Sequence, residues 1–454
     1  MASAYLSRTP STNGNQKKFT FSAWIKITKL GGQRTIFCGY YGNSSRYTQL
    51  WQGTDDKIVF FSGDYSTSAT TQAVNLKTTR TLRDTSAWYH LVLVVDTTLA
   101  TQADRAKLYI NGELETWDTG YGSHLLPDLN DEYFINVNTT PLYIGTYDTT
   151  STYFDGLMTH IHLTDGYAYA GSDFGETDST SGIWKPKTSP SVTYGTNGYF
   201  LKFENSGAMG TDSSGNGNNF TVSGTITQTE DTPSNNFSTF NPLNVPTSNA
   251  PSFSNGNNTV VTANGTAAYF GATSSLGVSS GKWYTEFKIS DATADAMIGI
   301  TYDPALDARN NDYSGRTDAS GWSYFSSGGD IYNNGSTPYG NGFTTGDIIG
   351  VAMDLDNAKL YFSKNGTFQN SGDPTSGATG TGAISITSGE TYFFSCGDGS
   401  GTSASTIQAN FGNGYFGTTA VASSNSDSAG LGLFEYSVPT GYYALCTKNI
   451  KNYG

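Results

Sequence analysis

Hydrophobic and polar residues alternate with a period of two along much of this chain. The clearest run covers residues 19–28, where five apolar residues alternate with a second, mostly polar set: Thr20, Ser22, Trp24, Lys26 and Thr28. Successive side chains of a strand point to opposite faces, so this pattern predicts a half-buried strand. Residues 88–95 are apolar on both faces instead, which predicts a central strand of a sandwich.

Further strands are predicted from similar short runs at residues 57–61, 108–110, 113–115, 142–145, 157–163, 199–203, 282–289, 347–354, 359–363, 392–394 and 408–411. Asn111-Gly112 and Asn365-Gly366 each follow one of these runs, and both dipeptides suit the two positive φ angles of a type I′ hairpin turn. Each is preceded by Ala-Lys-Leu-Tyr. The pattern predicts an all-β chain with the same hairpin in two related sandwiches.

The chain has 454 residues, which exceeds the roughly 250–300 residues at which a single core stops growing. Pro, Asn, Ser and Thr become more frequent between residues 185 and 254. Because such composition is typical of linkers, we expect the domain boundary near residues 244–254. The predicted domains are residues 1–245, including the closing strand at 199–203, and residues 253–454.

The charge balance limits the possible partners. The chain has 24 Lys and Arg against 38 Asp and Glu, a net charge of −14. Nucleic-acid binding needs clustered basic residues, so we expect no nucleic-acid partner. No apolar stretch approaches the roughly 18 residues of a membrane helix, so no membrane insertion is expected. Aromatic residues make up 14% of the chain, which argues against disorder.

The start of the chain and its cysteines indicate where it folds. No basic segment followed by an apolar one opens the sequence, so we expect no secretory signal. Cys38, Cys396 and Cys446 are odd in number and match no metal or redox spacing. Cys396 and Cys446 could pair if the fold brought them together, but we predict free buried thiols. Folding in a reducing cytosol follows from that prediction.

The four histidines offer little for catalysis. His160 and His162 are two residues apart on a predicted strand, which would place both rings on one side, but a third metal ligand with definite spacing is missing. His90 lies in an apolar strand and is expected in the core. No Ser-His-Asp or Cys-His order is recognisable, so we expect no enzyme. Glycosidases need two carboxyl groups at a defined distance in space, which the sequence does not reveal. A polysaccharide-degrading protein is therefore the enzymatic alternative.

One turn resembles the first half of a calcium loop, because Asp212, Asn216 and Asn218 alternate oxygen-bearing side chains around Gly217. The twelfth position is Ser223 rather than the bidentate Glu of such loops. We therefore favour a turn held by Asx-type hydrogen bonds, with calcium binding by these three residues as the alternative. No cofactor is required.

Aromatic and amide residues gather in the second half of the chain. We predict a ligand-binding set of Trp322, Tyr324, Tyr332, Tyr339 and Asn341. Flat aromatic rings can stack on the apolar side of a sugar, and amides bind its hydroxyls. Tyr332 and Tyr339 lie among turn residues and should be more exposed than Trp322 and Tyr324. The same mixture could also form a subunit contact.

The first half of the chain resembles laminin-G-like (concanavalin A-like) domains. The resemblance rests on residues 21–26 (FSAWIK), 88–92 (WYHLV) and 107–112 (KLYING), followed by 142–145 (LYIG) and 154–158 (FDGLM). It implies that the first half is a jelly-roll sandwich. Such domains often carry calcium, which adds weight to the alternative for the Asp212 turn.

The second half resembles a SPRY domain, through residues 281–284 (GKWY), 321–324 (GWSY), 346–354 (GDIIGVAMD) and 410–412 (NFG). Both resemblances imply concanavalin A-like antiparallel sandwiches in tandem. The tandem, together with the opening residues 4–10 (AYLSRTP), resembles virion structural proteins of tailed bacteriophages.

That resemblance implies a non-enzymatic protein of the virion surface, in a fibre, a tail or a capsid decoration, folded in the host cytoplasm before assembly. We expect it to adhere to a host-surface glycan or receptor and to contact other virion proteins. A homo-oligomer is expected, and fibre symmetry suggests a trimer. The alternatives are a polysaccharide-degrading tail spike and a purely architectural decoration protein without host binding.

Overall fold

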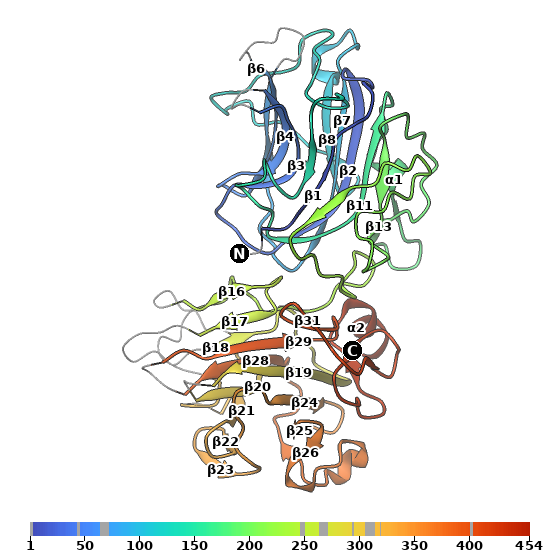
Figure 1. The fold of residues 1–454 in the computed structure, drawn as a ribbon. Coiled ribbons are helices and arrows are strands. Elements are labelled where there is room, and N and C mark those ends of the chain that lie inside the picture. Colours follow the sequence, from blue (N-terminus) through green and yellow to red (C-terminus); the bar gives the residue numbers. More distant parts are fainter. Residues whose placement is uncertain are drawn as a thin grey trace. The chain divides into compact units, whose positions relative to one another are not determined.

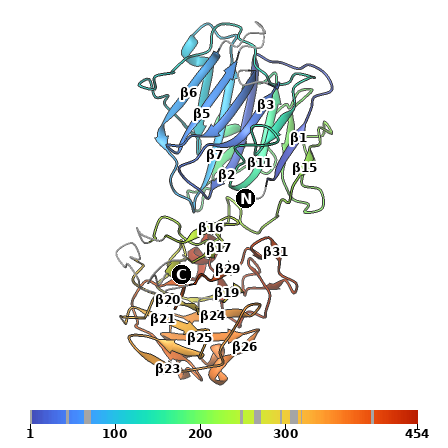
Figure 2. The same ribbon diagram turned by 60° about the vertical axis from the view of Figure 1, so that its left-hand side comes forward.

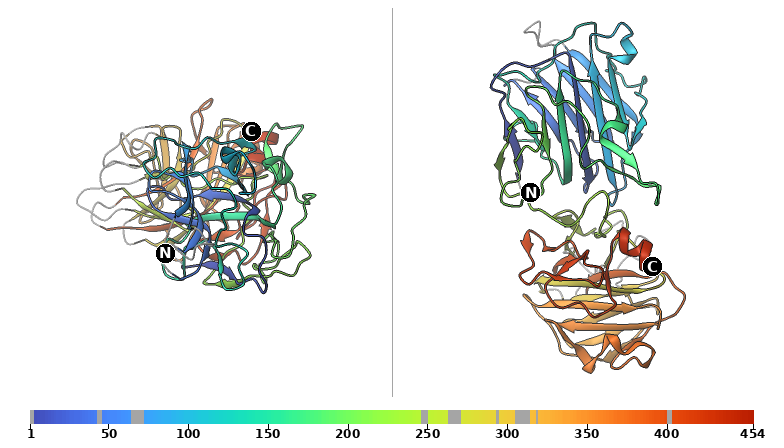
Figure 3. Two further views of the ribbon diagram at one scale, coloured as in Figure 1. Left: turned by 90° about the horizontal axis from the view of Figure 1, so that it is seen from above. Right: turned by 90° about the vertical axis from the view of Figure 1, so that its right-hand side faces the viewer.

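The structure is a computed structural model that describes residues 3–42, 46–63, 72–245, 250–262, 271–292, 295–304, 314–317, 319–399 and 403–454. It is 41% strand and 6% helix, which confirms the predicted all-β fold of two antiparallel sandwiches. Two compact units, Met1–Gln228 and Thr229–Gly454, each have their own sheets (Figure 1; Figure 3). No helix in the described ranges is long and apolar enough to cross a bilayer.

The first unit is a sandwich of two antiparallel sheets. The larger sheet has seven strands in the order β15 (Thr221–Ser223), β1 (Tyr5–Arg8), β10 (Leu142–Ile144), β3 (Arg34–Tyr40), β4 (Tyr47–Gln52), β5 (Lys57–Gly63) and β6 (Gln72–Thr81) (Figure 2). The other has six, in the order β14 (Tyr199–Leu201), β11 (Gly156–Asp165), β2 (Lys18–Ile27), β7 (Trp88–Asp96), β8 (Ala106–Ile110) and β9 (Glu113–Leu114). One apolar face of each sheet forms the core between them, where Phe21 of β2 stacks on Phe37 of β3 at 4.6 Å.

A third layer lies on the outer side of the six-stranded sheet (Figure 1). This covering segment, residues 166–198, contains α1 (Gly171–Phe174), β12 (Gly175–Thr177) and β13 (Trp184–Pro186). Its aromatic side chains pack on residues of the sheet, since Phe174 lies 5.0 Å from His162 and Trp184 lies 6.0 Å from His90, measured between ring centroids. The outer face of this sheet is therefore largely buried by the chain itself.

The second unit also has two sheets. The larger has the order β16 (Ser252–Ser254), β17 (Thr259–Val261), β29 (Thr406–Asn410), β19 (Lys282–Asp291), β24 (Ile348–Asp354), β25 (Lys359–Lys364) and β26 (Thr367–Phe368), with β27 (Ile384–Ser385) on β25 and β34 (Tyr443–Ala444) parallel to β19. The smaller has the order β18 (Gly271–Thr273), β28 (Phe393–Asp398), β20 (Ala296–Thr301), β21 (Gly321–Phe325), β22 (Asp330–Tyr332) and β23 (Ser336–Pro338). Short elements complete the described chain: η1 (Gln102–Asp104) in the first unit, and η3 (Gln369–Ser371), η4 (Pro374–Thr379), β30 (Tyr415–Phe416), β31 (Thr419–Ala420), β32 (Asn425–Ser426), β33 (Leu433–Phe434) and α2 (Thr447–Tyr453) in the second.

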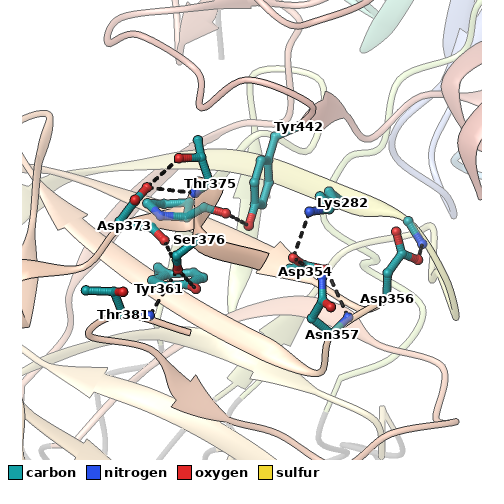
Figure 4. Close-up of polar contacts among 12 residues, drawn as sticks. Lys282, Asp354, Asp356, Asn357, Tyr361, Asp373, Thr375, Ser376, Thr381 and Tyr442 are labelled. Carbon is teal, nitrogen blue, oxygen red and sulfur yellow. Dashed lines mark hydrogen bonds and ion pairs between the residues drawn. The ribbon is translucent and has the colours of Figure 1, made fainter. Parts of the chain in front are cut away.

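The outer face of the nine-stranded sheet is covered by the chain as well. Residues 412–446, which we call the C-terminal strap, bring Tyr442 against the buried ring of Tyr361 and the loop around η4 (Figure 4). The Tyr442 hydroxyl donates to the carbonyl of Pro374 at 3.1 Å. Beside it, Lys282 pairs with the fully buried carboxylate of Asp354 at 2.9 Å. The Tyr442 contacts fix the strap to the sheet, and the ion pair joins β19 to β24.

Local predictions from the sequence are confirmed where the chain is described. Both hairpins turn at the expected dipeptides, with φ angles of 53° and 84° at Asn111 and Gly112. Asn365 and Gly366 follow with 48° and 79°. The three cysteines are buried and free, as expected.

The division between the units differs from the predicted boundary near residues 244–254, of which 246–249 lie outside the described residues. It falls at Gln228–Thr229, because residues 229–245 already belong to the second unit. Phe237 forms a bridge with Cys446, and Phe240 forms one with Ser274. Pairing with strands far along the chain overrides the linker-like composition of this stretch.

Candidate functional site

Two of the five predicted ligand residues are core residues of the second unit. Trp322 is 6% exposed and Tyr324 is fully buried. The Tyr324 ring stacks on Phe362 at 5.2 Å, and its hydroxyl donates to the backbone carbonyl of Asn341. Burial raises the pKa of this hydroxyl well above its usual value. Packing and the hydrogen bond therefore account for both aromatic residues without a ligand.

The other three residues lie nearer the surface. Tyr339 is half-buried, packs edge-on against Tyr324 at 5.9 Å, and accepts a hydrogen bond from the Phe362 amide at 3.2 Å. Asn341 is exposed, and its backbone N–H donates to Oε1 of Gln369 at 3.0 Å. Tyr332 contacts Phe325 instead, at 5.5 Å. The structure thus joins Tyr324, Tyr339 and Asn341 in one packed corner, and a ligand role for the five residues stays a prediction.

The predicted calcium ligands do lie on one loop. The buried Asp212 carboxylate accepts hydrogen bonds from the backbone amides of Phe200 at 2.9 Å, Ser214 at 2.8 Å and Asn218 at 2.8 Å. The amide groups of Asn216 and Asn218 donate to carbonyls in the neighbouring loop 195–198. This is the Asx-braced turn favoured from the sequence. Calcium binding there stays an untested alternative.

His90 is held in a buried, hydrogen-bonded position. Trp184 Nε1 donates to His90 Nδ1 at 3.0 Å, so the proton of the neutral ring is on Nε2, which donates to Ser22 Oγ at 2.9 Å. Burial lowers the pKa of His90 to about 3. Both Ser22 and His90 are fully buried, so a substrate has no access to this pair.

His160 and His162 lie on one side of β11, as predicted, because both rings pack on Phe200, at 5.7 Å and 3.9 Å between ring centroids. A β-bulge lies between Thr159 and His162, and His160 has a φ of 46°. His160 contacts the Thr159 hydroxyl and His162 contacts Tyr194, each at 3.0 Å. Across the described ranges no group of three His, Cys, Asp or Glu residues is placed to hold a metal ion.

A set of half-buried tyrosines lies on the outer side of the seven-stranded sheet. We call it the tyrosine face and define it as Tyr5, Tyr40, Tyr47, Tyr143, Tyr147 and Tyr153. Its rings are arranged in two contacting groups. Tyr147 lies 4.9 Å from both Tyr40 and Tyr47, and Tyr5 lies 5.9 Å from Tyr143 and 6.4 Å from Tyr153. The face crosses β1, β10, β3 and β4.

Strand alternation and register explain why these rings meet. Leu6, Leu50 and Leu142 point into the core. Residues at an odd distance from them along the same strand point outward, and these include Tyr5, Tyr47 and Tyr143. Tyr40 and Tyr47 are directly paired across β3 and β4. The loop after β10 is tied to β3 by a hydrogen bond of 2.9 Å from the amide of Thr35 to the carbonyl of Thr152. This contact holds Tyr147 and Tyr153 beside the strand tyrosines.

Three members of the tyrosine face, Tyr47, Tyr143 and Tyr147, are neutral at physiological pH. Burial, with a smaller contribution from Cys38, raises the pKa of Tyr47 to about 12, and burial also raises the pKa values of Tyr143 and Tyr147. Their hydroxyls therefore stay protonated and can both donate and accept hydrogen bonds. Flat rings with neutral hydroxyls suit the apolar side and the hydroxyls of a sugar.

Most of these tyrosines lie on strands, outside the turn-rich stretches in which aromatic residues suggested a ligand site. The available signal was different: Tyr5, Tyr47 and Tyr143 occupy outward positions of strands that each place a leucine on the inward side. An aromatic residue at an outward strand position points to a surface rather than to the core. Only the strand order, however, shows that these positions are neighbours.

Comparisons with known proteins agree with the two-unit fold. Residues 2–168 match the family described as the concanavalin A-like lectin/glucanases superfamily, and residues 282–395 match the SPRY domain family. No curated protein matches the chain.

Three of the solved structures that are similar to part of this chain differ in identity, TM-score and coverage. The SPRY domain of human HERC1 is 19% identical, with a TM-score of 0.30, over 37% of this chain and 96% of that one. Stonustoxin is 16% identical, with a TM-score of 0.29, over 38% of this chain and 27% of that one. The TRIM65 PSpry domain is 15% identical, with a TM-score of 0.28, over 38% and 89% of the two chains. From the two family matches, this chain carries a concanavalin A-like domain followed by a SPRY domain.

Proposed function

We propose that this chain is a non-enzymatic adhesion protein of a bacteriophage virion surface, in a fibre, a tail or a capsid decoration, and that its tyrosine face binds a host-surface glycan. The observation that carries the binding role is the face itself: six half-buried tyrosines on one side of a sheet. The virion setting is supported by the resemblance of the tandem sequence to phage structural proteins.

Adhesion through such a face needs many copies. A sugar held by a few ring contacts with a millimolar Kd gains only about −4 kcal/mol. Many copies on one particle can raise the overall avidity by roughly 10²–10⁴ without any new contact. Each weak site binds its sugar reversibly, whereas many sites together bind tightly. This combination suits the attachment of a particle to a cell.

The proposal is tested with the purified full chain on host cells and on a glycan array. We expect Tyr47→Ala combined with Tyr147→Ala to weaken glycan binding at least tenfold, because the larger ring cluster is removed. Tyr415→Ala, at a half-buried tyrosine of the second unit, is the matched control and should bind normally. Circular dichroism checks that the variants are folded.

Other results would favour the alternatives. Shortening of a host polysaccharide by the purified chain would show a degrading enzyme and contradict the proposal. Binding to virions without any binding to cells or glycans would show a purely architectural protein. Equal glycan binding by the wild type and the Tyr47, Tyr147 double variant would rule out the tyrosine face as the site.

A further inference from the structure

A groove lies on the opposite side of the first unit, on the outer face of β7 and β8. Its volume is about 300 Å³. The covering segment leaves these two strands partly open, so Val94 of β7 forms part of the groove lining with Lys107 and Tyr109 of β8. Residues 168–170 of the covering segment line it too. The tyrosine face is on the other sheet, so the two surfaces are separate.

The wall formed by the covering segment is fixed in place. The Thr20 hydroxyl donates to the carbonyl of Tyr167 at 3.1 Å and accepts a hydrogen bond from the amide of Tyr169 at 2.9 Å. At Gly171 an added Cβ would lie 3.2 Å from Cβ of Tyr109, so the backbone of α1 packs directly on that side chain. The groove is therefore built before any ligand arrives.

Two half-buried tyrosines, Tyr109 and Tyr169, line the groove. The hydroxyl of Tyr169 accepts a hydrogen bond from the amide of Thr193 at 2.9 Å, which fixes its orientation. The side chain of Val94 adds an aliphatic surface. Aromatic and aliphatic groups of this kind match the C–H face of a sugar ring.

The charged groups of the groove are already paired. Asp96 forms an ion pair with Lys18, with 2.7 Å between Oδ2 and Nζ, and Asp104 forms one with Lys107, with 2.8 Å between Oδ1 and Nζ. An ionic ligand would have to compete with these partners. A neutral ligand with hydroxyls does not, because each carboxylate can accept a further hydrogen bond and the Lys107 ammonium can donate one.

We propose that this groove is a second carbohydrate site, which holds one neutral sugar unit between Tyr109 and Tyr169. Its volume lies at the lower end of the range for small-ligand pockets, which fits a single sugar unit rather than a segment of polymer. The site is independent of the tyrosine face. Together the two sites would let one unit hold glycans on both sides of its sandwich.

The test is saturation-transfer NMR on the full chain with neutral methyl glycosides of glucose, galactose, mannose and N-acetylglucosamine. We expect signal transfer to at least one of them. Tyr109→Ala should weaken that binding at least tenfold, and Ala168→Trp, at an exposed position of the rim, should block the groove. Tyr109→Phe keeps the ring and should bind normally. Melting curves show which variants are folded, and Ala168→Trp tests the site if Tyr109→Ala does not fold.

The double variant Tyr47→Ala, Tyr147→Ala separates this inference from the proposed function. In this double variant the tyrosine face no longer contributes, so monosaccharide transfer from the groove should remain, and adding Ala168→Trp should abolish it. Binding to the glycan array through the tyrosine face should be weakened. The groove is overturned as a sugar site if no neutral glycoside shows transfer to the wild type, or if Ala168→Trp leaves transfer unchanged. Tighter binding of glucuronate or glucosamine than of every neutral sugar would overturn the neutral-ligand assignment.

Discussion

The indole N–H of Trp184 donates a 3.0 Å hydrogen bond to Nδ1 of His90, which joins the covering segment to the middle of the six-stranded sheet. His90 in turn donates to Ser22, and its ring stacks on Trp24 at 4.6 Å. This chain of contacts looks like part of a catalytic triad in outline. Because Ser22, Trp24 and His90 are buried under the covering segment, these contacts hold that segment on the sheet.

Replacing Trp184 by Phe should therefore destabilise the first unit. The substitution keeps an aromatic ring but leaves Nδ1 of the buried His90 without its donor, which costs about 1–3 kcal/mol. Chemical denaturation followed by the fluorescence of the first unit measures the loss. Thr188→Ala, at an exposed position of the same segment, is the control and should have a small effect. Equal stability of Trp184→Phe and the wild type would contradict this account.

The second unit should lose stability as the pH rises toward and past neutrality. The Glu286 carboxylate is fully buried and accepts the amides of Glu435 and Tyr436 of the strap, each at 2.8 Å. Burial raises its pKa from 4.5 to about 7, despite those hydrogen bonds.

The folded state thus binds the proton more tightly than the unfolded state. The stabilisation is complete below pH 4.5 and is lost as the pH rises through about 7, by an amount on the order of 3 kcal/mol. Glu286→Gln keeps an acceptor and cannot ionise, so we expect a flatter stability profile for it between pH 5 and 8. Urea unfolding of the second unit at several pH values tests this. Parallel profiles for both proteins would exclude Glu286 as the titrating group.

The first unit should respond to pH in the opposite direction. Burial lowers the pKa of His90 to about 3 and that of His160 to about 4, from 6.5. The unfolded state therefore takes up protons that the folded state refuses, so stability falls as the pH drops below 6.5. Each histidine contributes a loss of about 2 kcal/mol or more by the time its folded pKa is reached. His160→Gln should reduce this acid sensitivity in thermal melts between pH 7 and 4; unchanged sensitivity would argue against it.

The Asp212 loop should not depend on calcium for its structure. Its carboxylate already accepts three backbone amides and the Ser214 hydroxyl, so the turn is complete with protein donors. We expect EDTA to leave the melting temperature of the first unit unchanged. Asp212→Ala should lower its stability by about 3 kcal/mol, because buried amides lose a charged acceptor. A drop in melting temperature with EDTA that added calcium reverses would revive calcium binding.

Much of the fold is readable from short stretches of sequence. The alternation at residues 19–28, the doubly apolar run at 88–95 and the Asn-Gly turns at 111 and 365 are local signals, and each became the expected strand or hairpin. Strand and turn preferences act over a few residues, so no knowledge of distant partners was needed. The tandem of two sandwiches followed from chain length and from the repeated pattern.

Contacts between distant residues explain what these local signals missed. The boundary between the units lies at Gln228–Thr229 instead of the predicted residues 244–254, because Phe237 and Phe240 pair with residues far along the chain. Packing in the second core buries Trp322 and Tyr324, which agrees with the expectation that they are less exposed than Tyr332 and Tyr339.

The candidate surfaces show most clearly which features are set by local sequence and which by tertiary structure. The sequence places a tyrosine at positions 5, 40, 47 and 143, and alternation alone assigns the outward direction to most of them. That they form one face depends on β1, β10, β3 and β4 lying in that order, which long-range hydrogen-bonded register creates. The groove beside Tyr109 likewise exists only because a segment some sixty residues later folds back over the sheet, where Thr20 binds the backbone of Tyr167 and Tyr169. Side-chain direction is a local property of the strand, whereas a binding surface is made by strands that meet only when the whole sandwich closes.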